Sequence, residues 1–189
     1  MSRMLLTMFV IMLSALPLSA RPVKYLLETE KSSVGFIYNF NGNPTKGIMP
    51  VAAADLLVDL DRLGNTRIRV TLNARKAKAG FIFATDAMRS EKVLYTRRFP
   101  HIVFVSQQVR PHGKGARIKG LVTVRGVTRP MILDAGFFRQ KGTVAGDRSH
   151  LSILLTGSIM RSEFGAVGYP DLVGDRIDLR ILARIKMAN

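Results

Sequence analysis

The sequence predicts an all-β fold: one antiparallel domain, a closed barrel or a sandwich, of about eight to ten strands with one helical insert. Apolar and polar residues alternate with a period of two along most of the chain, which is typical of strands with one dry and one wet face. The stretch 79–96 departs from this alternation. A length of 189 residues suits a single domain with a sizeable core.

The alternation is cleanest in two stretches, Arg67–Lys76 and Ile177–Lys186. In both, aliphatic residues occupy every second position, and charged residues fill many of the positions between them. A slip of one residue would bury those charges. The pairing register of both strands is therefore strongly specified.

We predict seven further strands and one helix. Thr85 or Asp86 would cap a helix that runs to about Tyr95. Residues 162–172 are expected to form a loop, and Asn41–Pro44 a turn. The predicted strands are Val23–Glu30, Ser32–Phe40, Thr45–Asp61, His101–Val109, Ala116–Arg125, Met131–Arg139 and Ser149–Arg161.

The segment Gly120–Pro130 predicts two antiparallel strands joined by a tight connection. Gly126 interrupts a run rich in β-branched residues, as a bulge or a close backbone approach would. Pro130 has no N–H to donate, so we expect it at the first residue of a strand or on an edge.

Residues 1–20 have the features of a cleaved signal peptide, which leaves 21–189 as the mature domain. Arg3 supplies a short positive region, Met4–Leu18 is uncharged and apolar, and Ala20 is a small residue at the expected cut. A transmembrane anchor is the alternative, but the run is shorter than the ~20 residues that span a bilayer. The chain has no cysteine, which suits a bacterial periplasm, where disulfides are allowed but not required.

The formal net charge is +16, which favours contact with anionic surfaces such as acidic lipid head groups. Nucleic acid is a poor fit, because no dense basic cluster with interleaved aromatic residues is visible in the sequence. A generically basic, solvated surface is the simpler interpretation.

Residue patterns for catalysis or metal binding are hard to find, so we predict no enzyme, no metal and no cofactor. His101, His112 and His150 lie far apart in sequence and are interpreted as surface residues. Gly-x-Ser-x-Gly and Gly-rich phosphate loops are absent from the sequence. Asp55, Asp59 and Asp61 alternate onto what we expect to be a wet strand face.

Four stretches in order resemble one family, the YceI-like periplasmic proteins, also called polyisoprenoid-binding proteins. They are Tyr25–Phe36, Arg98–Phe104, Gly120–Pro130, and Arg161–Gly165 followed by Val173–Leu179. The resemblance covers about residues 23–187. The sequence departs from the family pattern at Glu28 and Lys31, which stand where the family usually has an aspartate and a histidine.

The resemblance implies a lipocalin-like barrel of about eight strands that holds an isoprenoid lipid, such as a quinone or a polyprenyl chain. A long apolar chain gains about 0.8 kcal/mol per buried methylene without polar chemistry. The aliphatic candidates would equally suit ordinary core packing. The residues expected to line the cavity are Phe36, Tyr38, Phe40, Phe81, Phe83, Met88, Phe104, Ile68, Val70, Leu179 and Ile181.

Three hypotheses follow. The first is a periplasmic, non-enzymatic carrier of an isoprenoid lipid. The second is a basic envelope protein that adheres to anionic membrane surfaces and has a packed barrel interior. The third and weakest is an enzyme acting on a lipid, because no nucleophile–base pair is visible in the sequence.

Overall fold

The computed structural model describes residues 22–140, 142–144 and 146–188. The predicted signal peptide therefore lies outside the described residues. In the part of the chain that is described, no helix has the length and apolar character needed to cross a membrane. The strands are β1 (Val23–Leu27), β2 (Ser33–Phe40), β3 (Asn43–Ile48), β4 (Val51–Val58), β5 (Arg67–Asn73), β6 (His101–His112), β7 (Gly115–Val124), β8 (Val127–Arg139), β9 (His150–Met160) and β10 (Val173–Met187).

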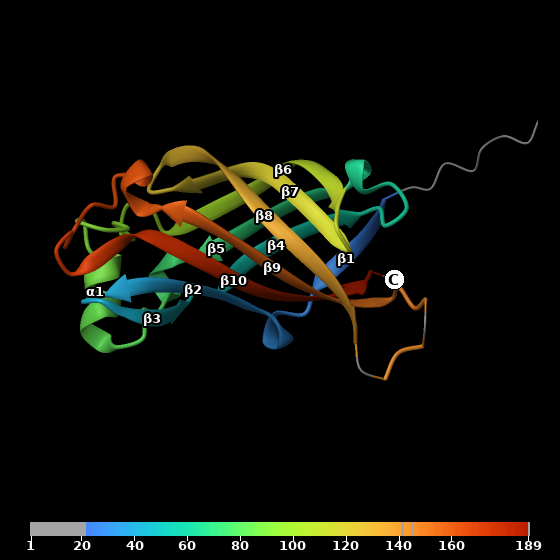
Figure 1. The fold of residues 1–189 in the computed structure, drawn as a ribbon, viewed down its shortest axis with the longest axis horizontal. Coiled ribbons are helices and arrows are strands. Elements are labelled where there is room, and N and C mark those ends of the chain that lie inside the picture. The colour runs from blue at the N-terminus through green and yellow to red at the C-terminus, as the bar shows by residue number, and fades with distance from the viewer. Residues whose placement is uncertain (1–21, 141, 145, 189) are drawn as a thin grey trace, which may run out of the picture.

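Eight of these strands form a closed antiparallel barrel, in the order β1-β4-β5-β6-β7-β8-β9-β10, and the pairing of β1 with β10 closes it (Figure 1). The predicted barrel of about eight strands is confirmed. One edge of β10 pairs with β9, and the other pairs with β1 near Ile185 and with β2 from Val173 to Leu182. β1 and β2 thus occupy successive parts of the same edge, separated by the short 3-10 helix η1 (Thr29–Lys31).

The β2–β3 hairpin extends the wall beyond the ring of eight. β3 pairs with β2, and Ile48 exchanges two backbone hydrogen bonds with Lys78, at 2.8 and 2.9 Å. The prediction of a single strand over Thr45–Asp61 is wrong, because the chain breaks at Met49–Pro50 into β3 and β4. The backbone N–H of Met49 bonds the carbonyl of Val34 instead, and proline cannot donate to a ladder.

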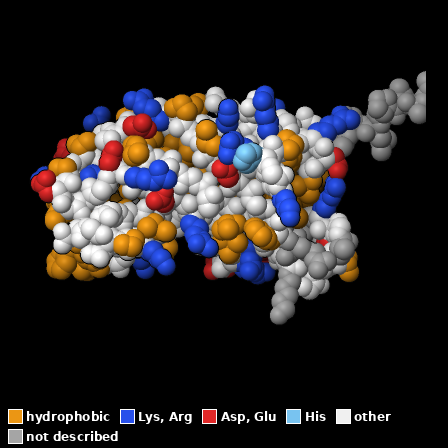
Figure 2. Space-filling model, viewed as in Figure 1, with side chains coloured by type: hydrophobic (Ala, Val, Ile, Leu, Met, Phe, Trp, Pro, Cys, Tyr) orange, Lys and Arg blue, Asp and Glu red, His pale blue; other side chains and the backbone are white. Residues whose placement is uncertain are grey.

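The alternation of the predicted strands is confirmed on β5 and β10. Ile68, Val70, Leu179 and Ile181 face the interior, while Arg180 is exposed. Lys and Arg side chains are spread over the visible outer face of the barrel (Figure 2). Along each of these strands, the side chains on the inner face of the wall are therefore apolar, and charged side chains lie on the outer face.

The helix α1 spans Ile82–Arg89, so its predicted start at Thr85 or Asp86 and its predicted end near Tyr95 were both wrong. Thr85 lies inside the helix, where its hydroxyl donates to the carbonyl of Phe81 (2.9 Å) and accepts from the N–H of Ala79 (3.0 Å). A hydroxyl that bonds the preceding turn does not cap a new helix. The remaining short helices are the 3-10 turns η2 (Leu63–Asn65), η3 (Ala74–Lys76) and η4 (Arg161–Phe164).

The predicted hairpin around Gly126 is confirmed, but as a two-residue turn. Arg125 and Gly126 both have positive φ, +53° and +76°, the combination that lets two antiparallel strands reverse without splaying. Pro130 is the fourth residue of β8 and pairs with Leu121. The pairing of β8 with β9 starts only at Leu133, so Pro130 lies on an edge section of β8, where its missing N–H costs no ladder bond.

Candidate functional site

The barrel encloses a cavity of about 570 Å³. Its wall is almost entirely aliphatic and aromatic, with side chains from β2, β4–β10 and α1. Volumes of about 300–1,000 Å³ are usual for small-molecule sites, which are mostly apolar and concave. The interior is therefore not the fully packed barrel of our second hypothesis.

All eleven side chains that we expected to line a cavity lie on this wall. Those on strands are Phe36, Tyr38, Phe40, Ile68, Val70, Phe104, Leu179 and Ile181, and those around α1 are Phe81, Phe83 and Met88. Two aromatic contacts connect them: the Phe40 and Phe81 rings meet edge to face at 5.2 Å, and the Phe36 and Tyr38 ring centroids are 6.1 Å apart. The first contact ties the tip of β2 to the start of α1.

The cavity opens at the end that carries α1. Phe81 and Phe83 both line the cavity, yet they are 41 % and 79 % exposed to solvent. Tyr169 and Leu172, from the loop before β10, also combine a place on the wall with exposure. Side chains that belong to the wall and to the outer surface at once mark the mouth of the cavity, which we call the α1 end.

The opposite end is closed by a core cluster of Tyr25, Leu56, Val58, Leu151 and Ile185, all less than a tenth exposed. We call it the closed end. Leu56, Val58 and Ile185 of this cluster also border the cavity, whereas Tyr25 and Leu151 lie outside its wall. The Tyr25 hydroxyl donates to the carbonyl of Arg148 at 2.8 Å, and burial raises the pKa of this phenol. A buried aromatic ring with its hydroxyl satisfied is a stable closure.

The polar side chains on the cavity wall, apart from Tyr169 at the solvent-exposed mouth, have hydrogen-bond partners in the protein. Ser32 bonds the backbone at Glu28 and Arg184, and Thr66 bonds the backbone of Asp59. The Tyr38 hydroxyl donates to the carbonyl of Ala79 at 2.7 Å, and burial raises its pKa. The wall therefore presents an apolar surface with few groups left to bind a polar substrate.

Arg161 is the fourth such polar residue, and sequence reasoning gave it no role. Arg161 is 8 % exposed, and its guanidinium donates to the carbonyls of Ala166, Gly168, Val173 and Gly174. Burial lowers the pKa of the guanidinium, although the charge of Asp175 opposes that effect. Arg161 thereby fixes the loop that forms one side of the mouth. A charged residue ending an otherwise apolar strand face was the available signal in the sequence.

Other wall residues were also missed. They belong to strands, to α1 or to the corner at Met49, and they have ordinary core-like side chains, so sequence alone offered no way to separate cavity from core. Among them are Met49, Val51, Ala54, Leu72, Ala84, Ala87, Ile102, Ile118, Phe137, Ile153 and Ala183.

The acidic residues of the β4–β5 connection correct one expectation. Asp59 is not on a wet face: it is buried, and its carboxylate accepts from the backbone N–H groups of Asp61 and Arg62 and from the Asn65 amide. These hydrogen bonds, that from Asn65 first, hold the pKa of Asp59 below its usual range. The residue organises a turn at the closed end.

The three histidines stay apart in space as in sequence. His101 and His112 are exposed and His150 is half-buried. Within the described residues, no three His, Cys, Asp or Glu side chains come together as a metal site would require.

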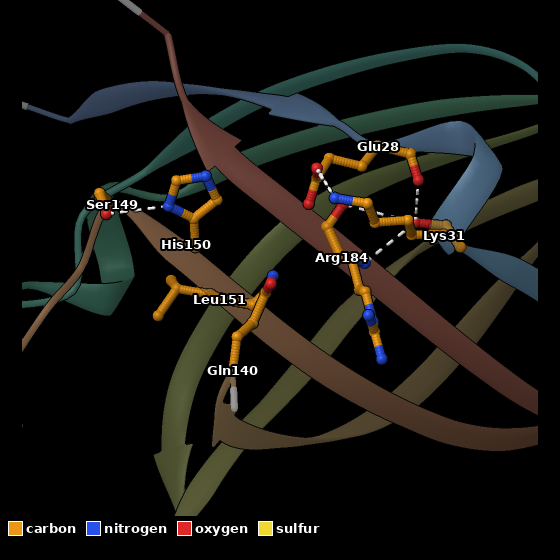
Figure 3. Close-up of polar contacts among 8 residues, drawn as sticks. Glu28, Lys31, Gln140, Ser149, His150, Leu151 and Arg184 are labelled. Atoms are coloured by element: carbon orange, nitrogen blue, oxygen red, sulfur yellow. Dashed lines mark hydrogen bonds and ion pairs between the residues drawn. The ribbon is translucent and has the colours of Figure 1, made fainter. Parts of the chain in front are cut away.

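Glu28 and Lys31 come just before β2, at the end of that strand that is farther from α1. They therefore lie away from the mouth of the cavity. Their side chains form an ion pair of 2.8 Å, drawn beside Arg184 in Figure 3. This ion pair, the largest influence, holds the pKa of Glu28 below its ordinary value. The Ser32 hydroxyl, beside this pair, donates to the carbonyl of Glu28 and accepts from the N–H of Arg184. These bonds attach the segment between β1 and β2 to β10.

Comparisons with known proteins agree with this architecture. A family model described as a YceI-like domain matches residues 25–185. A UPF0312 protein of Enterobacter sp. is 30 % identical over 74 residues, 39 % of this chain and 38 % of that protein. The protein YceI of Salmonella arizonae is also 30 % identical over 74 residues, 39 % of each chain. The matched stretch thus spans well under half the length of these relatives.

Solved structures show the same fold. BcnA of Burkholderia cenocepacia superposes with a TM-score of 0.73 at 16 % identity, over 84 % of this chain and 99 % of that one. A polyisoprenoid binding domain from Saccharophagus degradans, described as implicated in plant cell wall breakdown, gives a TM-score of 0.63 at 8 % identity, over 88 % and 99 %. At such identities the likeness concerns the fold alone.

Proposed function

Because the chain belongs to the YceI-like family and encloses an apolar cavity, we propose that it binds an isoprenoid lipid, a quinone or a polyprenyl chain, inside its barrel. It acts as a binding or carrier protein and catalyses no reaction. One structural neighbour is described as a polyisoprenoid binding domain, which supports this choice among apolar ligands.

The observation that carries the proposal is the state of the polar groups on the wall. Ser32, Tyr38, Thr66 and Arg161 are all hydrogen-bonded to backbone groups. The buried side-chain atoms without a partner, on Glu28, Arg89 and Arg184, belong to residues that are not part of the wall. A ligand in this cavity is recognised through apolar contact, which suits a long hydrocarbon chain.

Extraction of the purified protein with organic solvent, followed by mass spectrometry, tests the proposal directly. An isoprenoid lipid recovered in stoichiometric amount supports it. If no lipid is recovered, and the delipidated protein takes up neither an offered quinone nor a polyprenol, the proposal fails.

A matched pair of variants connects uptake to the cavity. Ala54 lines the cavity and its neighbour Ala53 is exposed on the outer face of β4. Ala54→Phe would fill part of the cavity, and displacing two methylenes at ~0.8 kcal/mol each should weaken uptake at least about tenfold. Ala53→Phe adds the same ring outside and should leave uptake unchanged. Thermal melts of both variants exclude unfolding as the cause, and equal affinities would place the ligand elsewhere.

The proposed carrier works in the periplasm. The motivation is the signal-like composition of residues 1–20, with one basic residue, an uncharged apolar run and a small residue at the end. Mass spectrometry of the protein in periplasmic extracts should give the mass of a chain that begins near residue 21. A full-length mass in the cytoplasmic fraction would contradict this location.

A further inference from the structure

Six large apolar side chains are exposed around the mouth of the cavity. Phe81, Ile82 and Phe83 come from the start of α1, and Val167, Tyr169 and Leu172 from the loop before β10. Ile82 and Phe83 are 70 % and 79 % exposed, and Val167 is 58 % exposed. We call these six residues the apolar rim.

The two segments of the rim lie beside each other, although some 80 residues separate them in sequence. The Phe40 ring contacts Phe81, and the backbone next to Phe40 joins the loop, where Asn41 N–H donates to the Leu172 carbonyl at 2.8 Å. On the other side, Gly168 N–H donates to the carbonyl of Lys92 at 2.9 Å. Both segments occupy the α1 end in Figure 1, and Figure 2 shows hydrophobic surface at that end.

The rim is continuous with the cavity wall. Phe81, Phe83, Tyr169 and Leu172 line the cavity themselves, whereas Ile82 and Val167 face outward only. Single exposed apolar residues are normal on a protein surface, but a group of this kind is typical of a contact site. Because the rim and the wall share residues, an apolar chain could pass from whatever covers the rim into the cavity without crossing water.

The charge around α1 suits a negatively charged partner. Residues 74–100 contain seven basic side chains and two acidic ones, Asp86 and Glu91. The loop side of the rim is different, since Glu163 and Asp171 lie there, so the attraction comes from the side of α1. Basic residues next to an apolar insertion surface favour a bilayer with anionic head groups.

We propose that the apolar rim docks on the surface of an anionic lipid bilayer and aligns the mouth of the cavity with the hydrocarbon interior. Ile82 and Phe83 enter the interfacial region, and the basic residues of 74–100 contact the head groups. The purpose assigned to this docking, loading and release of an isoprenoid, rests on the proposed function; the docking itself does not.

The test uses delipidated protein and vesicles of phosphatidylcholine with or without one quarter phosphatidylglycerol, with binding measured by flotation. The double variant Ile82→Ser/Val167→Ser removes rim residues that do not line the cavity. The control, Leu26→Ser/Ile132→Ser, removes exposed apolar residues from the outer faces of β1 and β8.

Wild-type protein and the control should bind the anionic vesicles, with binding that weakens as salt rises, because exposed charges are screened. The rim variant should bind at least about tenfold less. Equal binding by all three proteins would overturn the proposal. So would a rim-dependent dimer in sedimentation equilibrium with no vesicle binding, which would make a second copy of the chain the partner.

Ligand uptake from detergent micelles separates the two proposals. If the rim variant takes up the isoprenoid normally from micelles and fails to load from vesicles, both proposals stand. If the wild-type protein binds vesicles through the rim but takes up no isoprenoid from either source, docking stands and the proposed function fails.

Discussion

The two ends of the barrel are covered in different ways. At the closed end, Tyr25 and Ile185 are 2 % and 1 % exposed, and the Tyr25 hydroxyl is bonded to the backbone. At the α1 end, residues of the same wall remain open to solvent, and buried Arg161 organises the loop beside them through backbone carbonyls. One continuous β-wall thus surrounds a cavity that a packed cluster closes at one end and that opens to solvent at the other. The covering segments, and not the strands, make the difference.

The largest effect is expected from Tyr25→Ala at the closed end. Loss of a buried aromatic ring should lower the free energy of unfolding by about 3–5 kcal/mol. Phe83→Ala at the α1 end should change it by no more than about 0.5 kcal/mol, because that ring is largely solvated. Urea unfolding of the delipidated variants measures both, and similar losses would show that the two ends do not differ as described.

Arg161→Ala should have the next largest effect, and it should act locally. The substitution leaves four backbone carbonyls of 166–174 without their donor, at a cost of about 1–3 kcal/mol. Hydrogen exchange should accelerate in that loop and not at the closed end. Arg176→Ala is the control, since Arg176 is exposed and pairs only with Asp178. Unchanged hydrogen exchange of the loop in the Arg161 variant would contradict the role of Arg161 at the mouth.

Phe36→Ala separates cavity wall from core between the two ends. The Phe36 ring lies across Gly47 and leaves no room for a Cβ there, and Phe36 also lines the cavity. Because that space is already empty, we expect a loss of about 1–2 kcal/mol, below the range for a packed ring. Affinity for the extracted lipid should fall in proportion, roughly tenfold per 1.4 kcal/mol.

Tyr25→Ala, described above, is the control for Phe36, because Tyr25 belongs to the packed cluster at the closed end and does not line the cavity. Its expected loss of about 3–5 kcal/mol is the value for a packed ring. A similarly large loss for Phe36→Ala, with affinity unchanged, would return Phe36 to ordinary core.

The smallest effect concerns pH at the closed end. Because its hydrogen bonds lower the folded-state pKa of Asp59, the stabilisation is complete above the ordinary carboxyl pKa, about 3.9, and is lost as pH falls through the lower folded-state value. Asp59→Asn should therefore flatten the fall of stability below about pH 4. Asp171→Asn, in the mouth loop, serves as the comparison. Urea midpoints measured across this pH range give the dependence of stability on pH. If the Asp59 variant keeps the wild-type dependence, the role of Asp59 is contradicted.

Period-two alternation carried most of what sequence could predict. It assigned Ile68, Val70, Leu179 and Ile181 to the interior, and it made the barrel the expected fold. It could not show the break at Met49–Pro50, because the apolar pattern continues across the corner while the backbone hydrogen bonds do not. Local propensity likewise misplaced the start of α1, since a threonine inside a helix and a capping threonine look alike in sequence.

The mouth was the least predictable part of the site. The loop 162–172 has no periodicity, and its position depends on Arg161 and on a backbone bond between Gly168 and Lys92. Asp59 was misassigned for a related reason: its burial depends on the turn that folds over it, and strand alternation carries no information about a turn.

The long strand β10 also sets the order of events during folding. It is the last of the described strands, yet it pairs with β9, β2 and β1, and Tyr25 of β1 pairs with Met187. The first and last strands must therefore meet before the ring exists, and contacts this distant in sequence make folding slow. A nascent chain in which β10 is still inside the ribosome cannot close the barrel. We expect newly synthesised molecules to stay open until β10 has been synthesised, and truncations within β10 to prevent closure of the ring.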